Sequence, residues 1–148
     1  MATWGRCDFR QFKDLQKKLE KMVQADIDKF CEDCTKEIAA RLLGKVIRRT
    51  PVGQYPASTG KLGGTLRRGW TAKKDLRIVK TGSFYCIDIT NFVNYASYVE
   101  FGHRTKNHKG WISGRFMMTI SAQELEQQAP AIIEKKLMKF MGGVFDGR

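Results

Sequence analysis

Two kinds of segment are missing from this 148-residue sequence. No window approaches the ~18 consecutive apolar residues that a membrane-spanning helix needs. The N-terminal residues, MATWGRCDFRQF, contain no apolar run of the kind found in a signal peptide. The sequence therefore predicts a protein without membrane contact that is made and kept in a cytoplasm.

Cysteine is scarce, and its spacing argues against a metal site. Cys31 and Cys34 have the spacing of half a zinc site or of a redox dithiol. They lie within a helical pattern, however, and a redox dithiol would need a βαβ context. The other candidate ligands supply no second pair at matching spacing: Cys7, Cys86, His103 and His108. We expect free, buried or half-buried thiols and no metal or cofactor.

Acidic residues are also few, with 15 Asp and Glu against 27 Lys and Arg, which gives a net charge of +12. The excess lies mainly in the middle of the chain. Residues 61–80 contain seven basic residues and one acid, Asp75, and the segment from His103 to Arg115 contains no acid. Such a balance indicates a nucleic acid, an anionic surface or an acidic protein as partner, and charge alone does not choose among them.

A long amphipathic helix is the strongest pattern in the sequence. From Phe12 to Val46, apolar residues recur at intervals of three or four residues, and no proline interrupts this pattern before Pro51. Asp8 and Gln11 resemble a capping box at the start. A continuous helix over 9–48 would be ~60 Å long, so it must bend, break near residues 24–26, or protrude onto a neighbour.

The remainder predicts an α+β domain over 1–148, with a small antiparallel β-sheet packed against the long N-terminal helix and a C-terminal helix. A loop over 49–65 leads to a sheet region, 66–121, and then to a helical region, 122–141. The expected strands of the sheet region are 66–72, 76–80, 84–90 and 115–121.

Three features refine this expectation. A short helix over 95–101 stops at Gly102, and a basic loop follows it. Ser121 and Glu124 form a capping box for the C-terminal helix. Pro130 either kinks that helix or opens a second one, and the glycines at 142 and 143 end it.

No catalytic set of residues stands out, so we do not expect an enzyme. Glu100 lies among aromatic residues that could raise its pKa and make it a general acid. We favour a structural salt bridge to Arg104 or Arg115, because no second catalytic group accompanies Glu100. The aromatic residues near basic ones could form a stacking surface for single-stranded nucleic acid, although such residues more often fill a core or an interface: Trp70, Tyr95, Tyr98 and Trp111.

Several motifs occur in an order that resembles a known family. They are Thr50-Pro51-Val52, Thr59-Gly60-Lys61-Leu62, the segment YASYVEFGHR at 95–104, and Gly114-Arg115-Phe116-Met117. Together they resemble the tail-completion, or neck, proteins of long-tailed bacteriophages, typified by gene product ten of lambdoid phages. The sequence departs from that family by the insertion 53–58.

The resemblance implies a non-enzymatic α+β virion protein at the head–tail junction, produced in the cytoplasm of the bacterial host. It implies a ring subunit, sixfold to match the tail, that is needed for tail completion or head–tail joining. The implied neighbours are head-completion or connector proteins and tail-terminator or tail-tube proteins, with transient DNA in the lumen. The implied structural and interface residues are Tyr95, Tyr98, Glu100, Phe101, Gly102, His103, Arg104, Trp111, Arg115 and Phe116. The alternative is a basic nucleic-acid-binding module without enzymatic activity.

Overall fold

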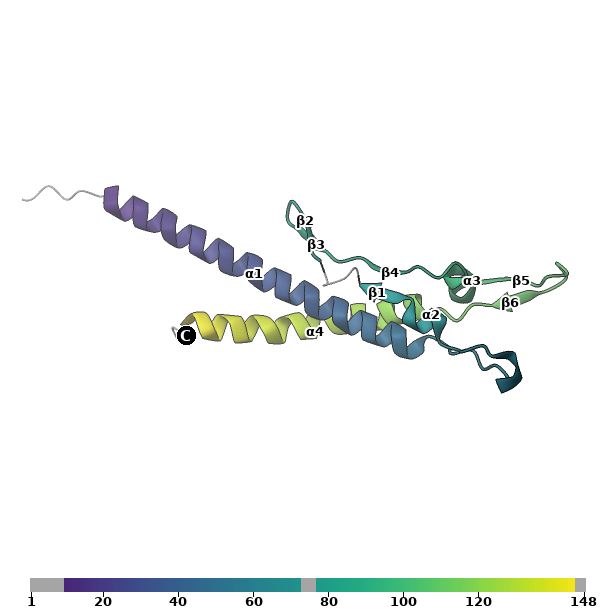
Figure 1. The fold of residues 1–148 in the computed structure, drawn as a ribbon. Helices are drawn as coiled ribbons and strands as arrows, with labels where there is room; N and C mark the ends of the chain where they lie inside the picture. Colours follow the sequence, from purple (N-terminus) through teal and green to yellow (C-terminus); the bar gives the residue numbers. More distant parts are fainter. Residues whose placement is uncertain (1–9, 73–76, 146–148) are drawn as a thin grey trace, which may run out of the picture.

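The computed structural model describes residues 10–72 and 77–145 (Figure 1). Its first element, α1, is one uninterrupted helix from Arg10 to Arg49. The prediction of a long helix is therefore confirmed, and no break occurs near residues 24–26. Asp8, the expected cap, lies outside the described residues.

The second long helix, α4, runs from Met117 to Phe145 and packs antiparallel to α1 (Figure 1). Three contacts fix this pairing. The rings of Phe30 and Phe140 are 5.0 Å apart at one end, and Glu37 pairs with Lys136 at 2.8 Å. Toward the other end, Glu124 of α4 binds two cations of α1. Because α4 continues for five residues beyond Phe140, it reaches past Phe30, and only the first turns of α1 extend beyond its end (Figure 1).

The start of α4 corrects two expectations. Residues 115–121 do not form a strand, because the helix begins at Met117. Ser121 is not its cap; it lies inside the helix, fully buried, and donates a hydrogen bond to the Met117 carbonyl. The helix also continues through Pro130 and past the glycines at 142 and 143, so Pro130 does not open a second helix.

The buried core is thin and lies where α1, α4 and the short helix α2 (Thr65–Arg68) meet. Val46 and Met117 are fully buried, and Thr50 is buried beside them with its hydroxyl bonded to the Val46 carbonyl. The indole of Trp70 donates to the Thr50 hydroxyl at 2.6 Å. The remaining buried apolar residues are Cys34, Ala39, Leu66 and Leu125.

The strands form three separate antiparallel pairs, which confirms an α+β fold with small sheets. Strand β1 (Trp70–Ala72) pairs with β4 (Ile89–Asn91), β2 (Val79–Thr81) with β3 (Phe84–Cys86), and β5 (Gly102–Arg104) with β6 (Trp111–Ser113). The expected strand over 84–90 is thus divided between two partners. The expected strand over 66–72 is shortened, because its first residues belong to α2.

The hairpin of β2 and β3 is tied to α1 through Asp28. The Lys80 ammonium lies 2.8 Å from one carboxylate oxygen, and the Tyr85 hydroxyl donates to the other at 2.6 Å. These two hydrogen bonds, that of Lys80 first, lower the pKa of Asp28 from 3.8 to about 2. The hairpin therefore lies against the middle of α1 (Figure 1).

The cysteines of α1 agree with the expectation of free thiols. The thiol of Cys34 is buried in α1 and that of Cys31 is half-buried; both are free, and burial raises the pKa of Cys34. Among the helices of residues 10–72 and 77–145, none has the length and apolar character to span a bilayer.

Candidate interaction site

The most distinctive feature is an arm at one end of the molecule, which consists of α3 (Ala96–Phe101) and the hairpin of β5 and β6 (Figure 1). The predicted short helix and its stop are confirmed, since Gly102 has φ 87° and caps α3. The expected basic loop is a hairpin in which His103 faces Ile112 and Arg104 faces Trp111 in register. A turn over 105–110 joins the strands, with a Thr105 amide bonded to the Gly110 carbonyl.

Two glycines allow the base of the arm to close. A Cβ on Gly102 would collide with the Ile112 carbonyl oxygen, and one on Gly114 would collide with the Glu100 carbonyl oxygen. The backbone amides of Arg115 and Phe116 donate to the carbonyls of Val99 and Glu100 at 2.7 and 3.0 Å. The chain that leaves the hairpin is therefore bonded to α3 before it enters α4.

Glu100 links the arm to α4. Its carboxylate accepts hydrogen bonds from the amides of Met118 and Thr119, at 3.0 and 2.9 Å, and from the Thr119 hydroxyl at 2.8 Å. The first amides of a helix have no partner within it, and the helix dipole favours a negative charge there. The expected salt bridge to Arg104 or Arg115 is wrong, because the acid serves as the cap of α4.

The aromatic residues of the arm are exposed, so they do not fill the core of the subunit. Trp111 is 61% accessible, and Tyr98 and Phe101 are also exposed on α3. The ring of Tyr98 meets that of the half-buried His103 at 5.8 Å. Tyr98 and Phe101 are three residues apart on α3 and therefore share a face, whereas Tyr95 precedes α3 and lines a cleft at the base of the arm. Phe116, just before α4, is exposed as well.

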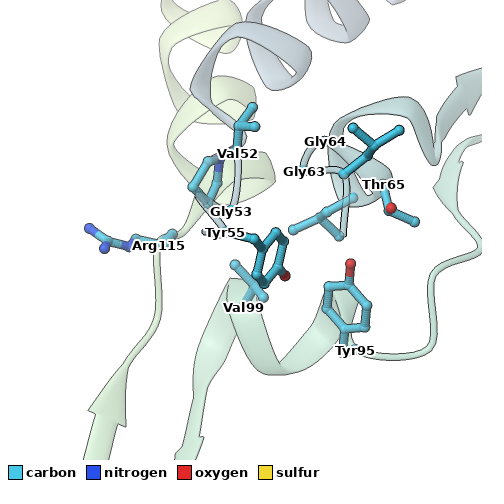
Figure 2. A pocket seen from close by; sticks show the side chains of 12 residues that line it. Val52, Gly53, Tyr55, Gly63, Gly64, Thr65, Tyr95, Val99 and Arg115 are labelled. Carbon is cyan, nitrogen blue, oxygen red and sulfur yellow. The ribbon is translucent and has the colours of Figure 1, made fainter. Parts of the chain in front are cut away.

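A cleft of about 370 Å³ lies at the base of the arm. It is bounded by the loop over 51–64, by α2, by α3 and by Arg115. Figure 2 shows the rings of Tyr55, from the loop, and Tyr95, at the start of α3, near each other in the middle of the view, while the side chain of Arg115 points away from them at the edge. Val52, Leu66 and Val99 add apolar lining, and no acidic residue borders the cleft.

The loop that forms one side of the cleft is held at its base by arginines. Arg67 donates two hydrogen bonds to the Thr50 carbonyl, at 2.7 and 3.1 Å, and Arg68 donates to the Gly63 carbonyl at 3.2 Å. The short 3-10 helix η1 (Ala57–Thr59) lies within the loop. Near it, the Lys61 ammonium is 6.0 Å from the centre of the Tyr55 ring.

Positive charge is concentrated at this end. Residues 48–68 and 91–116, which meet at the cleft, contain nine Lys and Arg and a single acid, a net charge of +8 out of +12. The acid is Glu100, which is buried against α4. In the described part of the chain, no ion pair involves Lys61, Arg68, Arg104, Lys106, Lys109 or Arg115.

Sequence reasoning identified the arm but missed the cleft. The structure brings Tyr95 and Arg115 together at the cleft, whereas Trp111 lies on the hairpin. Tyr55 was missed because it belongs to a segment that looked only like an insertion between two motifs. Tyr55 could have been recognised as a candidate site residue, because it is an aromatic residue in a loop that contains glycines, lacks acids and leads directly to Lys61.

Comparisons with known proteins agree with the resemblance seen in the sequence. Residues 13–102 match the model of the HK97-gp10-like family, which is named for gp10 of bacteriophage HK97 and described as a tail component. The match extends from α1 to the first residue of β5 and includes the loop and α3. No curated protein and no solved structure gives a match.

Proposed function

Since the chain belongs to the HK97-gp10-like family of bacteriophage tail components, we propose that it is a ring-forming subunit at the head–tail junction. Membership of that family makes it a structural protein of the virion. The finer proposal is that the ring completes the tail or joins it to the head. It acts by binding neighbours and catalyses no reaction.

The observation that carries this proposal is the large surface that the subunit leaves uncovered. The chain has an accessible surface of 12438 Å², whereas a compact monomer of 17.0 kDa has about 7,700 Å². Many large apolar side chains contribute to it, among them Leu62, Phe84, Phe92, Phe101 and Trp111. Exposed apolar surface of this extent is typical of proteins that bury it against partners.

The exposed apolar residues lie on separate parts of the molecule. Trp111 and Ile112 are on the arm, while Val23 and Ile27 are on the N-terminal half of α1. A cyclic ring needs such an arrangement, because one patch on each subunit meets a different patch on the next. The arm and the N-terminal half of α1 are therefore our two candidate interfaces between subunits.

Our proposal for the ring number and the neighbours rests on the resemblance of the sequence motifs and on the need to match a tail. We propose a sixfold ring between a head-completion or connector protein and a tail-terminator or tail-tube protein. Three acids have structural partners: Glu100 caps α4, Asp28 binds Lys80 and Glu124 binds Arg49. This supports a role in assembly.

The test is the mass of the purified chain in solution, measured across a range of concentrations, with two arm variants. We expect a closed oligomer for the wild type, dissociation of Trp111→Ala, and no change for Lys109→Ala, an exposed cation of the same hairpin. The urea midpoints of both variants should equal each other when measured on dissociated protein. A wild type that stays monomeric and binds no connector or tail-tube protein would overturn the proposal.

The second candidate function, a basic nucleic-acid-binding module, is supported by the segregation of charge. It is compatible with a ring, because DNA in the lumen of a ring could meet the basic end of each subunit. If Trp111→Ala and wild type had the same mass while both bound nucleic acid, this second function would be favoured over the first.

A further inference from the structure

We propose that the cleft between Tyr55, Tyr95 and Arg115 binds single-stranded nucleic acid. A base would lie against the tyrosine rings, and the phosphates on either side of it would meet the cations at the edge of the cleft. The inference goes beyond the role of a ring subunit, because it assigns a ligand to a site on each subunit.

The cations around the cleft are available to a ligand. Arg115 is exposed, and its side chain makes no hydrogen bond to the described residues. The Lys61 ammonium lies 6.0 Å from the centre of the Tyr55 ring, and Arg68 donates to a backbone carbonyl; within the described residues neither cation forms an ion pair with an acid. Glu100, the acid that follows Tyr95 in the sequence, is engaged by the amides of α4. The local potential is therefore positive and is not compensated by an acid.

The two tyrosines provide flat surfaces of the right kind for a base. Tyr55 is 52% exposed and Tyr95 is 46% exposed, and their rings lie near each other in Figure 2. Their hydroxyls make no hydrogen bond within residues 10–72 and 77–145, so packing does not explain their position. The volume of about 370 Å³ falls in the range of small-ligand sites. Stacking of bases on aromatic side chains tolerates any sequence, because every base has a π-face.

The distribution of cations favours a nucleic acid over an acidic protein. Beyond the cleft, the arm carries Arg104, Lys106 and Lys109, again without an acid beside them. Cations thus continue past the cleft along a projecting hairpin (Figure 1), as a chain of regularly spaced phosphates would require. An acidic peptide would match the charges but would make no particular use of two exposed aromatic faces.

The test is a titration of fluorescein-labelled oligothymidylate of 12 nucleotides, followed by fluorescence anisotropy at several salt concentrations. Duplex DNA of the same length and a poly-glutamate peptide serve as competitors. We expect single strands to bind more tightly than duplex. Three phosphate contacts give a slope of log K against log salt of about −2, since each contact contributes about −0.7. Arg115→Gln should reduce that slope by about 0.7.

The tyrosine variants separate stacking from charge. Tyr55→Leu or Tyr95→Leu should weaken binding about 5- to 150-fold, whereas Tyr55→Phe should stay within roughly twofold of wild type because the ring is kept. Lys139→Gln, an exposed cation on α4, is the matched control and should leave affinity unchanged. Unchanged urea midpoints would show that each variant is folded.

Equal affinity for duplex and single strand, or no loss in the leucine variants, would overturn the stacking site. If poly-glutamate competed as strongly as DNA, the ligand of the cleft would be an acidic protein, and the nucleic-acid proposal would also be overturned. The mass measurements on the same samples distinguish this failure from failure of the ring proposal. A ring that binds no DNA refutes only the cleft inference, and a monomer that binds DNA refutes only the ring.

Discussion

Replacing Glu100 with alanine tests the idea that one carboxylate joins the arm to α4. The substitution removes the acceptor of three hydrogen bonds and leaves the amides of Met118 and Thr119 without a partner. Each partly buried amide left unsatisfied costs about 1–3 kcal/mol, and the lost interaction with the helix dipole adds about 0.3–2 kcal/mol. Because these terms overlap, we expect a total loss of about 3–5 kcal/mol in the free energy of unfolding.

The assay is urea unfolding at one fixed protein concentration, since assembly would add to the apparent stability. With a urea dependence of about 2 kcal/mol per M, the midpoint of Glu100→Ala should fall by about 2 M. Glu100→Gln should lose less, because its amide oxygen still accepts one hydrogen bond. Glu126→Ala is the control, since this exposed acid of α4 has no partner among the described residues and should stay within ~0.5 kcal/mol.

Two results would refute this reasoning about Glu100. The first is an equal midpoint for Glu100→Ala and Glu126→Ala. The second is a loss of similar size in Arg104→Ala or Arg115→Ala, which would restore the salt bridge that the sequence favoured. A capping carboxylate predicts no such loss, because neither arginine contacts it.

Three further predictions concern the core, the base of the arm and the β2–β3 hairpin. Met117→Ala should destabilise the protein by about 2–5 kcal/mol in urea unfolding, whereas Met138→Ala, 70% exposed on the same helix, should stay within ~0.5 kcal/mol. Gly102→Ala should disturb the arm, seen as shifted amide resonances over 98–116, because its φ of 87° and the nearby carbonyl both oppose a Cβ. Gly142→Ala should leave these resonances unchanged, because Gly142 lies within α4 and a Cβ there would meet open space. The carboxyl of Asp28 should titrate with a midpoint near pH 2 when followed by NMR. Its contribution to the free energy of unfolding is then complete above pH ~4 and is lost as the pH falls through 2. A midpoint near 3.8 would contradict its contacts with the hairpin.

The elements that sequence could predict are those whose signal is local. The spacing of apolar residues from Phe12 to Val46 was enough for α1, because a helical period repeated over ten turns has no competing interpretation. Gly102 was a correct stop for α3, since a glycine can take the positive φ that ends this helix. These residues carry the information within a few positions of the structure they specify.

The elements that sequence could not predict depend on distant partners. Residues 115–121 look like a strand, yet they begin a helix because Glu100, 18 residues away, supplies the cap. Ser121 fits a capping box, but the helix already exists at that point and the hydroxyl bonds back to Met117. The cleft is similar, since Tyr55 and Tyr95 are 40 positions apart in sequence and only the fold places them at one opening.

The contacts around Glu100 bear on how the proposed ring would assemble. Within the arm, the chain that leaves the hairpin is bonded to α3 through Val99 and Glu100, the carboxylate of Glu100 holds the first turn of α4, and Glu124 of α4 binds Lys45 and Arg49 of α1. A neighbouring subunit that binds the arm therefore also restrains α4 and α1, because these hydrogen bonds and ion pairs connect the arm to α4 and α4 to α1. It follows that fixing the arm in a ring should slow hydrogen exchange in the first turns of α4, far from the contact itself. In Glu100→Ala the same neighbour could still bind Trp111, but that slowing should disappear, because the bond that carries the restraint is missing.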